Sequence, residues 1–184
     1  MTNLLPRFNI AAVPVDEDLR EDFYRAAASL EAFADGYCLA RGQALPHATL
    51  CQFRAADAAS ALRLVKGFAG EEIELQNTGL HIRKGEAEHS GTFWIEYAVA
   101  CAPRLMDLQT RIVGHLQKNA VEIFNKKNEG YHPHFTLVRT EGVLPRFDAT
   151  ALFDRRLVGD AFPCRLWLGL SDENGQFLKI LGPS

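Results

Sequence analysis

The sequence predicts an α+β protein built from antiparallel strands and amphipathic helices. Short apolar runs typical of strands are separated by segments whose apolar residues recur every three or four positions. Two pairs of these runs flank polar stretches, as the strands of hairpins do. The resulting order is strand, helix, strand, helix, hairpin, helix, strand, helix, hairpin, which differs from the regular alternation of parallel α/β proteins.

In the first half, residues 8–13 form the first expected strand, because apolar residues alternate there until Pro14. Asp16 is a suitable N-cap for an amphipathic helix that we expect to run until Gly36. The next expected elements are a strand at 45–53, a short helix at 57–66, and a hairpin of strands at 73–82 and 92–100.

In the second half, Pro103 opens the longest periodic segment, whose apolar stripe continues through Ala120 to Phe124. We expect a helix over this stripe, followed after Gly130 by a strand that carries the sequence YHPHFTL. The last expected elements are a weaker helix at 147–158 and a hairpin of strands at 164–170 and 176–181.

Composition predicts one folded unit, residues 1–184, since 184 residues with 47% hydrophobic content can bury one substantial core. The net charge of −3 provides no general attraction for long nucleic acids. The four cysteines are widely spaced, which favours reduced thiols over a disulfide framework. No signal peptide or long apolar run is evident, so we expect a soluble, cytoplasmic protein without a membrane span.

One short motif occurs twice, once in each half of the chain. The copies are PHATL at residues 46–50 and PHFTL at residues 133–137, each preceded by an expected amphipathic helix. A chance repeat of four fixed residues is improbable, and this makes the pair more specific than most short motifs.

The spacing within the motif has a physical meaning. Alternate side chains of a strand project from the same face, so His47 lies beside Thr49 and His134 lies beside Thr136. If the two halves are related by a pseudo-twofold axis, both pairs can meet in one cleft. Two imidazoles can then supply the base and the acid of an in-line displacement at phosphorus, and two hydroxyls can hold the non-bridging oxygens.

The tetrads HATL and HFTL resemble those of the two-histidine phosphoesterase superfamily, in particular the group of bacterial 2′-5′ RNA ligases and cyclic nucleotide phosphodiesterases. The resemblance implies two pseudo-symmetric lobes, each an antiparallel sheet with helices on its outer face, and an active-site groove between them. It also implies metal-independent opening of 2′,3′-cyclic or related phosphodiesters, without a cofactor, on an RNA terminus or a small nucleotide. We expect a monomer.

Carried over to this sequence, the resemblance implies that His47 and His134 are catalytic and that Thr49 and Thr136 bind phosphate. Arg139 matches a basic position of the second motif, although simple strand alternation places it on the face opposite His134. Tyr131, next to a polar loop, is a further candidate for substrate binding by stacking on a base.

Other functions remain open at this point. The same site run in reverse would join RNA ends through a 2′-5′ link, and a module without catalysis could bind RNA ends or nucleotides. A zinc site is the chemical rival, because His132, His134, His47 and Cys51 offer nitrogen and sulfur ligands. We expect no metal, since no carboxylate accompanies them at ligand spacing. We expect His132, which has no histidine counterpart in the first motif, to support the site or lie at the surface.

Overall fold

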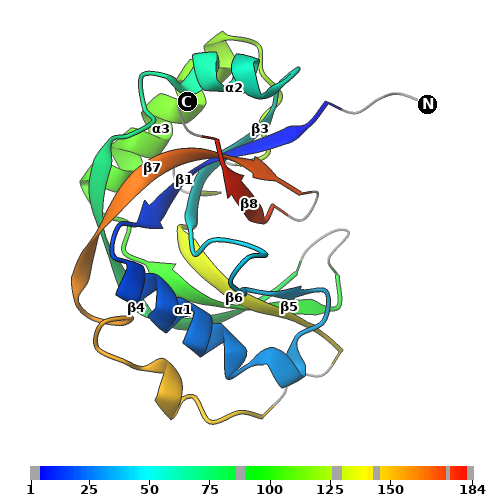
Figure 1. The fold of residues 1–184 in the computed structure, drawn as a ribbon, viewed down its shortest axis with the longest axis vertical. Helices are drawn as coiled ribbons and strands as arrows, with labels where there is room; N and C mark the ends of the chain where they lie inside the picture. The colour runs from blue at the N-terminus through cyan, green and yellow to red at the C-terminus, as the bar shows by residue number, and fades with distance from the viewer. Residues whose placement is uncertain (1–4, 86–89, 126–129, 143–145, 173–174, 182–184) are drawn as a thin grey trace.

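The computed structural model describes residues 5–85, 90–125, 130–142, 146–172 and 175–181, and its α+β architecture is shown in Figure 1. The strands are β1 Arg7–Pro14, β2 Tyr37–Cys38, β3 Ala48–Arg54, β4 Glu72–Lys84, β5 Thr92–Val99, β6 His134–Glu141, β7 Ala161–Ser171 and β8 Phe177–Ile180. The helices are α1 Glu17–Ala28, α2 Ala58–Val65 and α3 Pro103–Lys118, and the 3-10 helices are η1 Glu31–Phe33 and η4 Thr150–Leu152. The predicted fold class is confirmed.

The strands in the described residues form one eight-stranded sheet, and their recorded pairings are antiparallel. Its order is β1-β3-β6-β5-β4-β7-β8, and an additional pairing of β1 with β7 closes six strands into a ring. The ring is visible in Figure 1 as strands that curve around a common centre. The two expected sheets are therefore continuous with each other.

Within the ring of six strands, the pairings are unchanged when β1, β3 and β4 are exchanged with β5, β6 and β7, respectively. The exchange turns the β1–β3 pair into β5–β6 and the β4–β5 pair into β7–β1. It leaves the β3–β6 and β4–β7 pairs as they are. This pattern is what a pseudo-twofold axis through the β3–β6 contact would produce.

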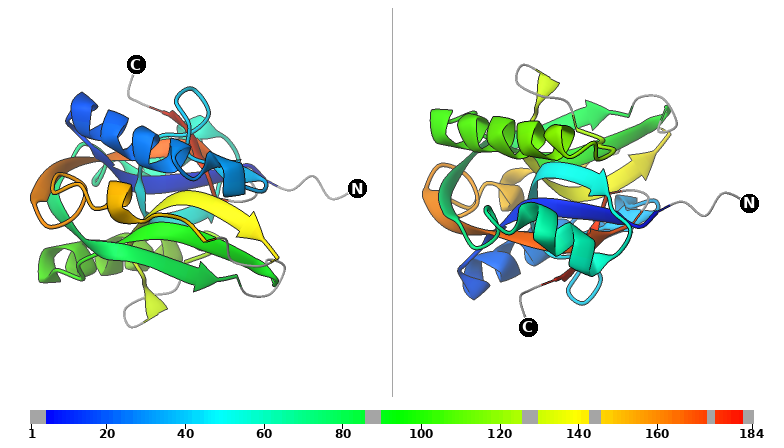
Figure 2. Two further views of the ribbon diagram at one scale, coloured as in Figure 1. Left: turned by 90° about the horizontal axis from the view of Figure 1, so that it is seen from below. Right: turned by 90° about the horizontal axis from the view of Figure 1, so that it is seen from above.

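Helices α1 and α3 lie on opposite sides of the strands (Figure 2). Phe23 of α1 shows why the two halves need each other, because its ring packs on aromatic rings of the second half. The ring centroids lie 5.8 Å from Tyr97, 4.7 Å from Phe135 and 6.2 Å from Phe162. All four rings are part of the main core.

Two expected helices are shorter in the structure. The first ends at Ala28, where Ser29 caps it, and a separate 3-10 turn follows before Gly36. The third ends at Lys118, and Ala120 has a positive φ of 54° that cannot continue a right-handed helix. Of the weak helix expected at 147–158, only the 3-10 helix η4 forms.

The short strand β2 was not predicted. It pairs with the outer part of β6, opposite Arg139 and Val138. Among the helices that the structure describes, none combines the length and the apolar character that a membrane crossing requires.

Candidate active site

The two motif strands meet at one residue pair. The partner of Ala48 on β3 is Phe135 on β6, and each of these residues lies between the histidine and the threonine of its motif. Both side chains are fully buried in the core. Side chains alternate along a strand, so the flanking histidines and threonines project from the opposite face, where all four line one cleft.

Each motif strand carries a β-bulge at the leucine of its tetrad. The register of β3 passes over Leu50, between the pairs Ile10–Cys51 and Ala11–Thr49. The register of β6 passes over Leu137 at the equivalent place, between the pairs Ile95–Val138 and Glu96–Thr136. The leucine of each tetrad therefore marks a β-bulge. The bulge shifts by one position the alternation of the side chains that follow it.

The two histidines are held in the same way. Nδ1 of His47 lies 2.8 Å from the carbonyl oxygen of Leu45, and Nδ1 of His134 lies 2.8 Å from the carbonyl oxygen of His132. A carbonyl can only accept, so in each ring Nδ1 donates a proton and Nε2 of the neutral ring keeps its lone pair. In both neutral rings, Nε2 is therefore the basic nitrogen.

Burial lowers the pKa of both histidines. The pKa of His47 falls to about 4, although the carbonyls of Leu45 and Gly175 act in the opposite direction. The pKa of His134 also falls to about 4, chiefly through burial and with smaller contributions from the charges on His132, His47 and Arg83. Both rings are therefore neutral near pH 7.

Thr49 is oriented by a buried residue that the sequence did not single out. Nδ2 of Asn9, on β1, donates to Oγ1 of Thr49 at 2.8 Å, and Asn9 is fully buried. Because the hydroxyl oxygen already accepts this bond, its own proton is free to be donated into the cleft.

The cleft has a volume of about 330 Å³. Besides the four motif residues, its lining includes Arg83, Lys84 and Trp94 from the β4–β5 hairpin and Gln52 from β3. Two cations and an indole ring therefore border the histidines. None of these residues belongs to the repeated motif, and an isolated arginine such as Arg83 is usually solvated surface, so local sequence did not single them out.

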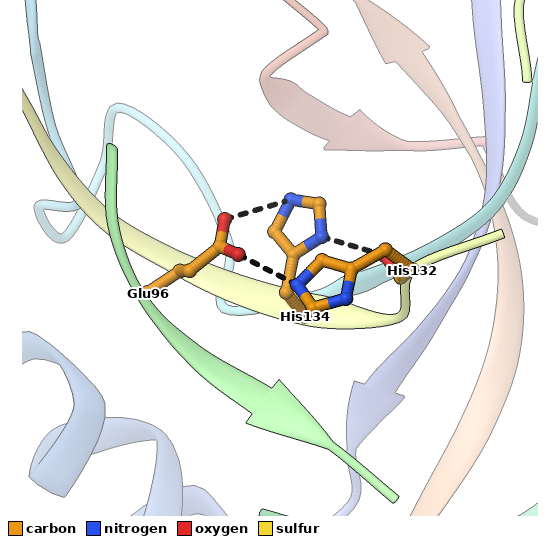
Figure 3. Close-up of side chains that lie close together, drawn as sticks. All are labelled: Glu96, His132 and His134. Carbon is orange, nitrogen blue, oxygen red and sulfur yellow. Dashed lines mark hydrogen bonds and ion pairs between the residues drawn. The ribbon is translucent and has the colours of Figure 1, made fainter. Parts of the chain in front are cut away.

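Glu96 is the most consequential residue that sequence reasoning missed. Its buried carboxylate lies 2.8 Å from Nε2 of His132 and 3.5 Å from Nε2 of His134, as Figure 3 shows. Burial raises the pKa of Glu96 to about 7 and lowers the pKa of His132. The only sequence signal was a single carboxylate inside the apolar run FWIEYAVA.

Arg139 lies on the cleft side of β6, because the bulge at Leu137 reverses the alternation that predicted the opposite face. It does not reach the histidines. Its Nε donates to the carbonyl of Asp35 at 3.0 Å, and its guanidinium lies 5.8 Å from the centroid of the Trp94 ring. Arg139 thus supports a wall of the cleft.

The geometry does not support stacking of Tyr131 on a substrate base. Its side chain is buried, and its hydroxyl donates to the backbone carbonyl of Thr49 at 2.8 Å. This contact joins the chain before the second motif to the strand of the first. Tyr131 therefore braces the two motifs against each other.

The ligand set considered for zinc also changes. Cys51 is fully buried in the core. The described residues that could together hold a metal ion are instead Glu96, His132 and His134, whose ligand atoms all lie within 4.8 Å of one another.

Solved structures share this fold along nearly the whole chain. Escherichia coli LigT, in complex with 3′-AMP, matches with a TM-score of 0.58 and 18% identity, over 91% of this chain and 88% of LigT. TT0787 of Thermus thermophilus matches with a TM-score of 0.57 and 16% identity, over 96% and 95% of the two chains. Kluyveromyces marxianus Usb1 matches with a TM-score of 0.50 and 10% identity, over 95% of each chain.

No family model and no curated protein matches the chain in sequence. The likeness is one of fold, and at that level the resemblance predicted from HATL and HFTL is confirmed.

Proposed function

From the fold shared with the two-histidine phosphoesterases and from its own paired motifs, we propose that this protein is a phosphodiesterase that opens 2′,3′-cyclic or related cyclic phosphodiesters. The observation that carries the proposal is the convergence of both imidazole–hydroxyl pairs on one cleft. We infer that His47 and His134 are the catalytic pair and that Thr49 and Thr136 bind the phosphate.

The proposed reaction is an in-line displacement. Nε2 of one histidine takes a proton from water while the water oxygen attacks phosphorus. The other histidine, protonated, gives its proton to the departing ribose oxygen as the P–O bond breaks. The threonine hydroxyls donate to the non-bridging oxygens, where negative charge must be stabilised.

One histidine must be protonated for this reaction, yet burial keeps both neutral near pH 7 in the free protein. A bound phosphodiester brings a negative charge into the cleft that the two rings line. A negative charge near a histidine raises its pKa. We propose that substrate binding raises the pKa of the histidine that acts as the acid, so that this histidine becomes protonated.

The rest of the cleft suits a nucleotide. Trp94 offers an aromatic surface for a base, and Arg83 and Lys84 offer positive charge for phosphate. The complexes of LigT with 3′-AMP and with NADP+ support ligands of this class. A small nucleotide or an RNA terminus is therefore the proposed substrate.

The test is a screen of 2′,3′-cyclic mononucleotides and 2′-5′ dinucleotides with products identified by phosphorus NMR. The His47→Ala/His134→Ala double variant is the blank. We expect opening of a cyclic phosphate that persists after treatment with a strong chelator. Joining of RNA ends would instead show the reverse, ligase direction, and nucleotide binding without turnover would show a binding module.

A further inference from the structure

We infer that Glu96, His132 and His134 form a binding site for a divalent transition-metal ion such as Zn²⁺, and that the ion blocks catalysis by occupying His134. The blocking step depends on the proposed function, whereas the site itself does not. Glu96 comes from β5, His134 from the start of β6 and His132 from the segment just before β6, and their side chains converge as Figure 3 shows.

The geometry is close to that of a zinc site. Two ligands bound tetrahedrally at ~2.0–2.1 Å from zinc lie about 3.3 Å apart. Here a carboxylate oxygen lies 2.8 Å from Nε2 of His132, and the other lies 3.5 Å from Nε2 of His134. Small side-chain rotations would bring all three ligand atoms around one ion.

The surroundings also suit a metal ligand. His134 donates its Nδ1 proton to the carbonyl of His132, which fixes the ring and leaves Nε2 as the ligand atom. Glu96 is 2% exposed, so its carboxylate is held in place by packing. Two imidazoles and one carboxylate favour zinc, copper or nickel over magnesium and calcium, which prefer all-oxygen sites.

Internal comparison indicates that the phosphoester chemistry does not require this carboxylate. The first half has the same imidazole, hydroxyl and bulge, but Ala11 takes the place of Glu96 and Leu45 takes the place of His132. His47 is thus held without either residue. A second function of Glu96 and His132 accounts for their presence beside only one of the two histidines.

Metal bound at Nε2 of His134 would use the lone pair that proton transfer needs. A tetrahedral ion held by three protein ligands would have one further position, where water or a phosphate oxygen could bind. We therefore expect Zn²⁺ to inhibit turnover reversibly and a chelator to restore it.

The test is calorimetric titration of the chelator-treated full-length protein with ZnCl₂ and, separately, MgCl₂. We expect one Zn²⁺ per chain and no comparable binding of Mg²⁺. His132→Ala and Glu96→Gln should each weaken Zn²⁺ binding about a hundredfold, because loss of an outer-shell partner alone costs 10–100-fold. His132 has a side chain that is 31% exposed, so its replacement tests the site even if Glu96→Gln is unstable.

Two histidine variants serve as matched controls. His47→Ala removes the other cleft histidine and His115→Ala removes an exposed histidine of α3, and both should keep wild-type Zn²⁺ affinity. The melting temperature should rise with Zn²⁺ in these controls, as in the wild type, because a ligand that binds only the folded state stabilises it.

The outcomes separate the site from the proposed function. Zn²⁺ binding that depends on His132, in a protein that opens no cyclic phosphate, supports the site and contradicts the proposed function. Equal Zn²⁺ affinity in the wild type and His132→Ala overturns the site. Saturation of the site without loss of phosphodiesterase activity overturns the inhibition.

Discussion

At the scale of single residues, the two histidines should act as one unit. We expect His47→Ala and His134→Ala each to lower the turnover of a cyclic phosphate by about a hundredfold or more. The double variant should cost much less than the product of the two single effects, because neither proton transfer is useful without the other. Steady-state kinetics on all three variants would measure this.

The matched control is His115→Ala, which removes an exposed histidine of α3 and should leave turnover unchanged. Near-normal turnover by either single cleft variant would show that the roles are wrongly assigned.

Glu96 should make stability depend on pH in a defined direction. Burial raises the pKa of Glu96 from 4.5 in the unfolded chain to about 7. Between these values the unfolded chain loses a proton that the folded protein keeps, so the contribution of Glu96 to stability is complete below pH 4.5 and is lost as the pH rises to 7. The buried histidines titrate in the opposite sense over pH 4 to 6.5, so a difference between variants is needed.

We expect Glu96→Gln to gain free energy of unfolding relative to the wild type as the pH rises, by about 3 kcal/mol at most. Urea unfolding of both proteins at pH 5 and pH 8 would measure the gain. An equal difference in free energy of unfolding between the two proteins at both pH values would mean that burial does not destabilise the ionised carboxylate of Glu96.

The sequence could predict the catalytic candidates but not their neighbours, for a physical reason. The repeat of one motif identifies the four candidates His47, Thr49, His134 and Thr136. The relevance of Glu96 comes from its register opposite Thr136, and that of Asn9 comes from a bond to Thr49 across two strands. The pairing register of strands that are far apart in the sequence cannot be read from local periodicity.

At the scale of secondary-structure elements, β7 and β8 should support His47 through one aromatic ring. The ring of Phe177 lies 5.3 Å from that of His47, and a Cβ added to Gly169 would overlap it. We expect Gly169→Ala to lower stability by about 1–3 kcal/mol, as overpacking in a core does, and to lower turnover by displacing His47.

Thermal unfolding and kinetics would measure both effects. The control is Gly79→Ala on β4, where an added Cβ would meet no atom within 4 Å. If the two alanine variants behave alike, Phe177 does not hold His47.

Element types were easier to predict than element ends. The apolar stripe of α3 continues to Phe124 in the sequence, yet the helix stops at Lys118. Beyond it, the backbone N–H of Phe124 bonds to the carbonyl of Gln52, and Ile123 bridges to Phe53. These tertiary bonds to β3 outweigh helix propensity, and nothing local in the sequence reveals them.

At the scale of the whole molecule, each half should be unable to fold alone. Phe23 completes a core made of Phe135, Tyr97 and Phe162, and the β1–β7 and β4–β5 pairs join the halves on both sides. We expect a fragment of residues 1–85 to be unfolded by circular dichroism, and likewise a fragment of residues 90–184.

Mixing the two fragments should restore part of the native spectrum, since the missing contacts all lie between them. Cooperative unfolding of either fragment by itself would show that the halves are independent domains. The expectation of one unit over residues 1–184 would then fail.

The near-equivalence of the two halves also bears on how the cleft could orient a bound phosphodiester. Around the Ala48–Phe135 pair, each histidine donates Nδ1 to a backbone carbonyl in the same way, so these backbone contacts do not distinguish the two orientations of a bound phosphodiester. Directionality must come from the side chains that differ between the halves, such as Glu96 beside His134 and Phe177 beside His47. Exchanging these differing side chains between the halves, with the catalytic groups untouched, is therefore the route by which the preferred orientation of the substrate would be reversed.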